Sequence, residues 1–164
     1  MPSALIVIDV QEAFINNASR QLPPKIKDHL AAQSYDFVVF SKFINRKDSN
    51  FVKKLGWAKC TKPPETDIAF ELRDLAESHT VFERSTYSVF GSEGFLEFLK
   101  AKKIDKLHFC GLYLEACVMA SVFDAFDHGF DYEIMFDLSE CFNKAQLDSC
   151  TKKLFWYNFG ARAD

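Results

Sequence analysis

The sequence predicts an α/β fold, a three-layer α/β/α arrangement in which helices cover both faces of a mostly parallel sheet of five to six strands. Two observations predict it. Short, continuous apolar runs such as ALIVID (4–9) and DFVVFSKF (36–43) are typical of strands buried on both faces of a parallel sheet. Segments with helical spacing stand between these runs, and this alternation is the order found in α/β domains.

Each element has its own signal in the sequence. Strands are expected at 4–9, 36–43, 79–83, 106–111 and 131–137. Helices are expected at 23–33, 67–78, 92–103, 116–129 and 143–160, with a short helical turn at 51–55. The run 116–129 is apolar nearly all round, which predicts a buried helix, and Gly129 suits its C-cap. Without a repeat or a linker, residues 1–164 are expected to form one domain.

The composition excludes several classes of protein. The basic residues are scattered and the net charge is −3, so no nucleic-acid surface is predicted. No apolar run approaches the roughly 20 residues that a membrane span needs. The N-terminus lacks the basic start of a secretory signal, and the five cysteines are an odd number. Free thiols in a reducing compartment, the cytoplasm, are therefore expected.

Candidate functional residues follow from where the strands end. In an open parallel sheet, ligands bind outside the carboxyl ends of the strands. Asp9 ends the first predicted strand, Arg84 follows the third, and Cys117 comes shortly after the fourth. Cys117 would lie in the first turn of a helix, where the dipole favours a thiolate and free N–H groups can hold an oxyanion. These positions predict a nucleophilic cysteine with Asp9 as its base.

Plainer interpretations of these residues stay open at this point. Cys117 can be a buried structural thiol, Asp9 a capping residue, and Arg84 a surface ion pair. A structural role suffices for the four other cysteines: Cys60, Cys110, Cys141 and Cys150. The four histidines are isolated, without an HxH or HxxxH pair, so no His-based metal site is predicted. No GxGxxG or Walker sequence supports a nucleotide-binding protein.

Three motifs together resemble the isochorismatase-like cysteine hydrolases. They are LIVIDVQEAF, FERSTYSVFGSEGFLEFL and CGLYLEACVMASVFDAFDHGF, in the family's order and over most of the chain. FSKFINRKDSNFVKKLGW (40–57) is also similar to a compact subgroup of that family. The resemblance implies the three-layer fold and a catalytic triad of Asp, Lys and Cys.

The triad carries over with one departure. Asp9 matches the Asp and Cys117 the nucleophile, but Arg84 stands at the Lys position. A lysine can release a proton when buried, whereas an arginine effectively cannot. A second departure is Leu114–Glu115 in place of Thr–Asp. The family's non-proline cis peptide would fall at Leu112–Tyr113 and turn the N–H of Tyr113 toward that of Cys117, which would make an oxyanion hole.

The resemblance implies a cysteine-dependent hydrolase of a small amide or related C–N bond, acting through a covalent acyl-enzyme. The alternative is a weak or inactive relative that binds a small molecule or a protein partner, because Arg84 replaces lysine. The candidate substrate contacts are Phe14, Phe43, Asn45, Trp57 and Tyr87, with Tyr113 also shaping the pocket. The family's metal-binding branch has histidines that KFINRKD (42–48) lacks, so we expect no metal and no cofactor.

The expected partner is a small-molecule substrate, with no nucleic acid and no membrane. The aromatic stretch LFWYNFG (154–160) suits either an interface between copies of the chain, which would make a homo-oligomer, or the core of one chain. Both interpretations stay open from the sequence.

Overall fold

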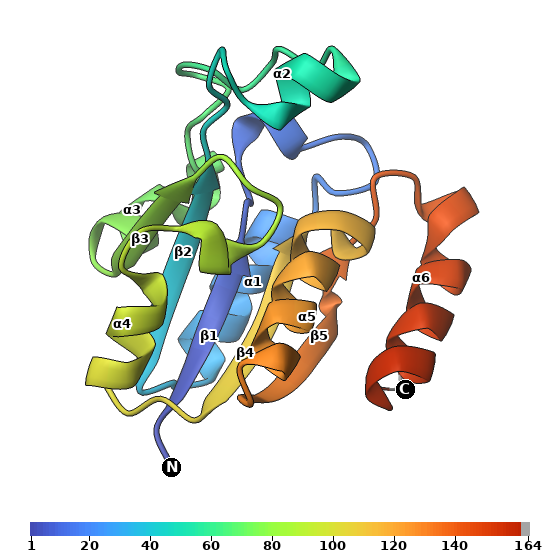
Figure 1. Ribbon diagram of the computed structural model, residues 1–164. Helices are drawn as coiled ribbons and strands as arrows, with labels where there is room; N and C mark the ends of the chain where they lie inside the picture. The colour runs from blue at the N-terminus through green and yellow to red at the C-terminus, as the bar shows by residue number, and fades with distance from the viewer. Residues whose placement is uncertain (162–164) are drawn as a thin grey trace.

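The computed structural model describes residues 1–161 and contains a five-stranded sheet with helices on both faces (Figure 1). The strands are β1 (Ser3–Ile8), β2 (Phe37–Phe43), β3 (Thr80–Arg84), β4 (Lys106–Leu112) and β5 (Asp131–Glu140). Their order is β3-β2-β1-β4-β5, and every neighbouring pair is parallel. The predicted fold class is confirmed, and β1 lies at the centre of the sheet.

The helices form the two outer layers. They are α1 (Leu22–Ala32), α2 (Asn50–Leu55), α3 (Arg73–Glu77), α4 (Phe95–Ala101), α5 (Met119–Asp127) and α6 (Lys144–Phe159). Three short 3₁₀ segments and one π turn join them: η1 (Glu12–Phe14), η2 (Phe70–Leu72), η3 (Val89–Gly91) and the π turn η4 (Leu114–Val118). The helices α1 and α3 cover one face, while α4, α5 and α6 cover the other. The short helix α2 stands beyond the end of the sheet (Figure 1).

The central strand explains why its sequence is apolar without alternation. Leu5 and Val7 pack into the core on the α1 side, whereas Ile6 and Ile8 pack into the core on the α5 side. All four side chains are almost fully buried. A strand between two helical layers has no face for polar residues, so a continuous apolar run is what the fold requires.

Two helices differ from their predictions. Only the turn η2 and the five-residue α3 form between 67 and 78, because Ile68 instead makes an isolated bridge with Gln11. The helix expected at 116–129 is apolar nearly all round and was predicted to be buried, but α5 is buried on one side only. Val122 and Ala125 face the sheet, but the side of the helix turned away from it is only partly covered, and Phe126 remains 54% exposed.

One glycine lets two strands approach closely at the functional end of the sheet. Gly111 on β4 pairs with Ile8 on β1 and has a φ of 118°. A Cβ atom at this position would run into the backbone of Ile8. Only glycine tolerates both the positive φ and this contact, so it permits the path that β4 takes toward η4.

The C-terminal aromatic stretch divides between core and surface. Phe155 is fully buried, whereas Trp156 and Tyr157 are 54% and 83% exposed.

Within the described residues, no helix is both long enough and apolar enough to cross a membrane.

Candidate active site

The three candidate catalytic residues lie at the carboxyl end of the sheet. Asp9 directly follows β1, Arg84 is the last residue of β3, and Cys117 lies in η4, just beyond β4. The strand β2 separates β1 from β3. The long side chain of Arg84 reaches across β2 to Asp9, so the pairing depends on the strand order.

Asp9 and Arg84 form a buried, bidentate ion pair. Nη1 of Arg84 donates to Oδ1 of Asp9 at 2.6 Å, and Nη2 donates to Oδ2 at 2.8 Å. The two side chains are 1% and 0% exposed. Burial acts against the charge of Arg84, but the carboxylate of Asp9 outweighs it and raises the pKa of the guanidinium. Arg84 is therefore a permanent cation in this site and not a proton donor.

Further hydrogen bonds fix the guanidinium in place. Nε of Arg84 donates to the carbonyl oxygen of Ser88 at 3.0 Å, and Nη2 donates to that of Tyr87 at 2.6 Å. The loop after β3 thus wraps around the side chain. The interpretation of Arg84 as a surface ion pair is excluded by its burial.

A buried serine, which the sequence analysis did not single out, supports Asp9. Oγ of Ser41 on β2 donates to Oδ1 of Asp9 at 2.8 Å and accepts from its backbone N–H at 3.2 Å. Asp9 has a φ of 50°, which is uncommon outside glycine and clusters at functional sites. Ser41 therefore helps to hold both the backbone and the carboxylate of Asp9. A serine inside a predicted strand gives no such signal in the sequence.

The thiol of Cys117 shares this environment. Burial and then the negative charge of Asp9 raise the pKa of Cys117 well above its ordinary value, and the charge of Arg84 opposes them without cancelling them. The thiol is therefore neutral in the resting site at neutral pH. The position of Cys117 near a helix start favours a thiolate, but the nearby carboxylate and the exclusion of water outweigh this effect and the charge of Arg84. Deprotonation must accompany attack.

We expect iodoacetamide to alkylate Cys117 slowly at pH 7.5, with a rate that is still rising between pH 8 and pH 10. The raised pKa keeps the thiol protonated to higher pH than the value near 8.5 of an ordinary cysteine. Peptide mass spectrometry would measure the rate, with the exposed Cys150 as the faster reference. The fully buried Cys110 should stay unlabelled and so report that the chain remains folded. Labelling of Cys117 faster than Cys150 at pH 7.5 would contradict a neutral thiol.

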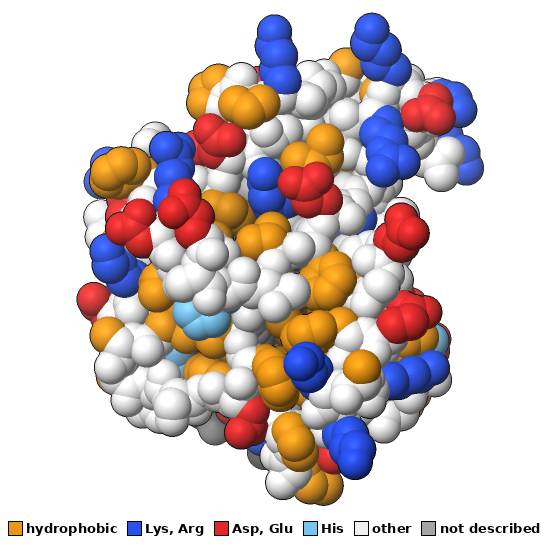
Figure 2. Space-filling view, turned by 90° about the vertical axis from the view of Figure 1, so that its left-hand side faces the viewer, with side chains coloured by type: hydrophobic (Ala, Val, Ile, Leu, Met, Phe, Trp, Pro, Cys, Tyr) orange, Lys and Arg blue, Asp and Glu red, His pale blue; other side chains and the backbone are white. Residues whose placement is uncertain are grey.

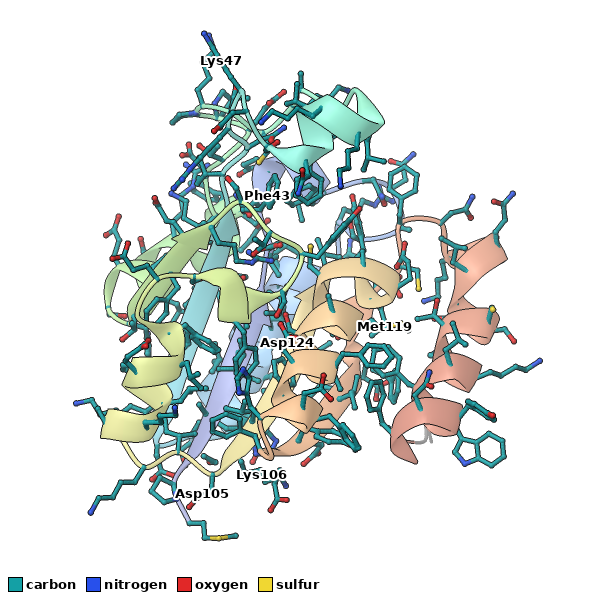
Figure 3. The ribbon with its side chains drawn as sticks, viewed as in Figure 1. Phe43, Lys47, Asp105, Lys106, Met119 and Asp124 are labelled. Carbon is teal, nitrogen blue, oxygen red and sulfur yellow. The ribbon has the colours of Figure 1, made fainter. Side chains whose placement is uncertain are left out.

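A cavity of about 360 Å³ opens over Cys117. Its lining residues are Phe14, Phe43, Phe51, Leu55, Trp57, Tyr87, Tyr113, Ala116 and Cys117. The rings pack on one another: Phe14 stacks on Trp57 with centroids 6.2 Å apart, and Phe51 meets Tyr87 edge-on at 4.8 Å. Figure 3 shows Phe43 lying below α2, between this helix and the end of the sheet. Five aromatic residues singled out from the sequence thus share one wall.

Asn45 is the exception among the candidate substrate contacts, and its place needs a correction. Its side chain is buried outside the cavity wall, with its amide donating to the carbonyl oxygens of Trp57 and Lys59 at 2.9 and 3.0 Å. Its Oδ1 accepts from Ser49 at 2.6 Å. Since these bonds occupy the side chain, Asn45 shapes the loop that carries Trp57.

Two wall residues were missed by the sequence analysis. Phe51 and Leu55 lie four residues apart on α2, so both point from one side of this helix into the cavity. Ser49 caps the start of this helix, with its side chain accepting a hydrogen bond from the N–H of Val52, and Gly56, with a φ of 65°, caps its end. The i, i+4 spacing of two apolar residues was the signal in the sequence that could have placed both on one side of a short helix.

The candidate oxyanion-hole residues lie where β4 turns into α5. The peptide bond between Leu112 and Tyr113 is cis, and the π turn η4 carries Cys117. π turns within helices are frequent at functional sites. Ser121 ties this region to the loop beside Arg84, because its Oγ donates to the carbonyl oxygen of Cys117 at 2.7 Å and accepts from Val89 N–H at 3.0 Å.

Within residues 1–161, the structure contains no cluster of three or more His, Cys, Asp or Glu side chains that could hold a metal ion. The charged groups at the site are Asp9 and Arg84, whose mutual hydrogen bonds occupy both carboxylate oxygens. The arrangement can supply a nucleophile, a proton acceptor and a fixed positive charge.

Known structures share this fold along nearly their whole length. A nicotinamidase from Bacillus subtilis is 24% identical with a TM-score of 0.83, and the match covers 99% of this chain and 98% of that one. An N-carbamoylsarcosine amidase from Thermoplasma acidophilum is 22% identical with a TM-score of 0.82, covering 99% and 95%. A cysteine hydrolase from Pseudomonas syringae pv. phaseolicola is 17% identical with a TM-score of 0.82, covering 98% and 87%.

No curated protein matches the chain significantly in sequence. The family model for the isochorismatase domain matches residues 3–155, which include β1, the loop after β3 and the turn that holds Cys117. The match spans all of the candidate active site. The chain therefore belongs to the isochorismatase family of hydrolases.

Proposed function

We propose that this protein hydrolyses the C–N bond of a small amide through a covalent thioester on Cys117. The observation that carries the proposal is the placing of the thiol, which lines a 360 Å³ apolar cavity and lies beside the Asp9–Arg84 pair. A cavity of this size suits a small molecule. The two amidases with this fold act on small amides by their names, and this agrees with the proposal.

In the first half-reaction, Asp9 accepts the proton of the Cys117 thiol while the sulfur attacks the amide carbonyl. The backbone N–H groups of Tyr113 and Cys117 hold the negative oxygen of the tetrahedral intermediate. The C–N bond then breaks, Asp9 returns the proton to the leaving nitrogen, and an amine or ammonia departs. Water hydrolyses the remaining thioester and restores the thiol.

Arg84 has an electrostatic part in this scheme. It cannot carry protons, so all proton transfer falls to Asp9. Its positive charge opposes the rise in the pKa of the thiol, and it stabilises the thiolate as that charge develops. Its hydrogen bonds also orient the carboxylate.

The test is a panel of small amides assayed for release of ammonia or amine, together with acid quenching and peptide mapping. An active amide should leave its acyl group, as an added mass, on the peptide that contains Cys117. Added hydroxylamine should divert the thioester to a hydroxamate. Hydrolysis that never gives an acyl mass or a hydroxamate, and that survives full alkylation of Cys117, would rule out the covalent route.

A second candidate function is binding without efficient turnover. It is favoured by one observation: both carboxylate oxygens of Asp9 are already engaged by Arg84, and Ser41 adds a third hydrogen bond. Three of the four lone pairs of the carboxylate are then engaged, and one, on Oδ2, is left to accept the proton of Cys117. The Arg84→Lys variant separates the two candidates.

We expect Arg84→Lys to lower kcat by about tenfold to a hundredfold. Lysine cannot reproduce the bidentate contact with Asp9, and it leaves the carbonyl oxygens of Tyr87 and Ser88 without their donor. Steady-state kinetics on the best amide would measure it. Arg73→Lys is the matched control, since Arg73 pairs with Glu12 near the surface and should leave kcat unchanged. A rise in kcat for Arg84→Lys would favour the binding function, with arginine as the cause of weak turnover.

A further inference from the structure

The basic residues are concentrated in one segment, which corrects the expectation that they are scattered. The lid segment, residues 42–62, has seven of the chain's 20 basic residues and one acidic residue, Asp48. The rest of the chain has 13 basic and 22 acidic residues. A protein with net charge −3 thus has a strongly positive segment, and that segment contains α2 and Trp57.

Most of these charges face solvent. The exposed members are Arg46, Lys47, Lys53, Lys54, Lys59 and Lys62. The seventh basic residue of the lid segment, Lys42, forms an ion pair with Glu83 at 3.3 Å, and among the described residues none of the other six forms one. Figure 2 shows Lys and Arg side chains gathered at the top of the molecule, and Figure 3 shows Lys47 pointing away from it there.

Acidic residues beside the lid segment already have partners. Glu65 accepts from the backbone N–H of Cys60 at 2.6 Å, and Glu12 accepts from Arg73 at 3.0 Å. Among the described residues, neither carboxylate forms an ion pair with a basic residue of the lid segment, so the net positive charge of that segment can attract an anion from outside.

The same segment forms the outer wall of the cavity over Cys117. Phe51, Leu55 and Trp57 line the cavity, and Leu55 is also 63% exposed, so it lies at the mouth. On a helix with 3.6 residues per turn, Lys54 stands beside the face that carries Phe51 and Leu55. Apolar wall and positive rim are therefore built from one short helix.

The interior of the cavity has the opposite character. Among the described residues, no charged side chain lines it. A carboxylate or phosphate buried there would lose its water without gaining a partner, which is costly. The same group held at the rim would remain hydrated and would be attracted by the lysines. A ligand that suits both regions has an apolar end and an anionic end.

We propose, on the basis of the function proposed above, that the substrate is an amphipathic anion: an amide whose apolar body fills the aromatic cavity and whose carboxylate or phosphate lies at the lid. The lysines steer this end of the molecule and orient the amide toward Cys117. The attraction acts through water at the rim, so salt weakens it.

Binding tests the inference without depending on turnover. The protein is the Cys117→Ala/Trp156→Phe variant, which cannot form the thioester and keeps Trp57 as its one tryptophan. The probes are 4-(4-methylphenyl)butanamide and its analogues in which a carboxylate or a phosphate replaces the ring methyl group. Quenching of Trp57 fluorescence gives each dissociation constant at 50 mM and 500 mM NaCl.

We expect at least one anionic probe to bind about tenfold tighter than the methyl probe at 50 mM NaCl, with the advantage falling below about threefold at 500 mM. The anionic probe with the lower dissociation constant identifies the head group as carboxylate or phosphate. Adding Lys53→Gln and Lys54→Gln should weaken anion binding at least threefold and leave the methyl probe unchanged. Lys100→Gln with Lys102→Gln, an equal loss of charge near the opposite end of the sheet, should change neither.

Equal affinity for all three probes, or equal effects of the two lysine pairs, would overturn the inference. The function proposed above fails separately. Tight, salt-sensitive binding of an anionic probe that the wild-type protein does not hydrolyse would leave the ligand class standing and reject the hydrolase. If the wild-type protein hydrolyses the methyl probe as efficiently as both anionic probes, the hydrolase stands and the anionic ligand class is rejected.

Discussion

Replacing Cys117 by alanine is expected to lower kcat/KM for any amide substrate by at least about a thousandfold, down to the level of the uncatalysed reaction in the assay. The thioester cannot form without the sulfur, and loss of a covalent nucleophile removes most of the rate enhancement in enzymes of this kind. Continuous detection of released ammonia would measure the loss. Binding should survive, because the aromatic wall of the cavity is unchanged.

Two controls keep this result interpretable. Cys150→Ala removes an exposed thiol on α6 and should leave kcat/KM unchanged. The melting temperature of Cys117→Ala should stay within a few degrees of the wild type, because Cys117 lines a cavity and its truncation leaves the packed core filled. A Cys117→Ala protein that keeps a tenth or more of the activity would place the nucleophile elsewhere.

The parallel sheet was predictable because its signal is local. Runs such as ALIVID have no room for polar residues, and a strand buried on both faces demands this composition whatever its neighbours are. Helix α5 shows the limit of such reasoning. Its apolar surface predicted burial, but how far α6 covers it depends on where that helix packs, and Phe123 remains 41% exposed.

The site was predictable in part, because the ends of the strands can also be located from local sequence. Asp9 and Cys117 follow directly from the rule that ligands meet the carboxyl ends of strands. The contact between Arg84 and Asp9 needed the strand order and the length of a side chain crossing β2. Ser41 could not be assigned from sequence, since a buried serine beside a carboxylate looks like an ordinary strand residue. Asn45 was assigned as a substrate contact, but its amide braces the loop that carries Trp57, and this depends on how the chain folds back there.

The neutral state of the Cys117 thiol also could not be predicted from sequence. A helix start and a nearby arginine favour a thiolate, and both are present. The outcome depends on how completely water is excluded and on the charge of Asp9, and these raise the pKa. The balance of three effects exists only in the folded site.

Replacing Asp9 by asparagine is expected to lower kcat by about a thousandfold or more and to destabilise the protein by about 3–5 kcal/mol. Asparagine cannot accept the thiol proton, and its amide N–H₂ would face a donor of Arg84 in place of a carboxylate oxygen. Because the side chain of Arg84 is 0% exposed, its charge would be left buried and without a counter-ion. Urea unfolding would measure the stability and amide kinetics the activity.

The double variant Asp9→Asn/Arg84→Met separates the two effects. It removes the uncompensated charge, so it should be more stable than Asp9→Asn alone, since the cost lies in the unpaired ion and not in the loss of the pair. Its activity should stay as low as that of the single variant, because the proton acceptor is still missing. Recovery of stability without recovery of activity would show that the low activity of Asp9→Asn does not come from instability, as expected if Asp9 is the base for Cys117 as well as the partner of Arg84. An active Asp9→Asn protein would contradict the first role, and a fully stable one the second.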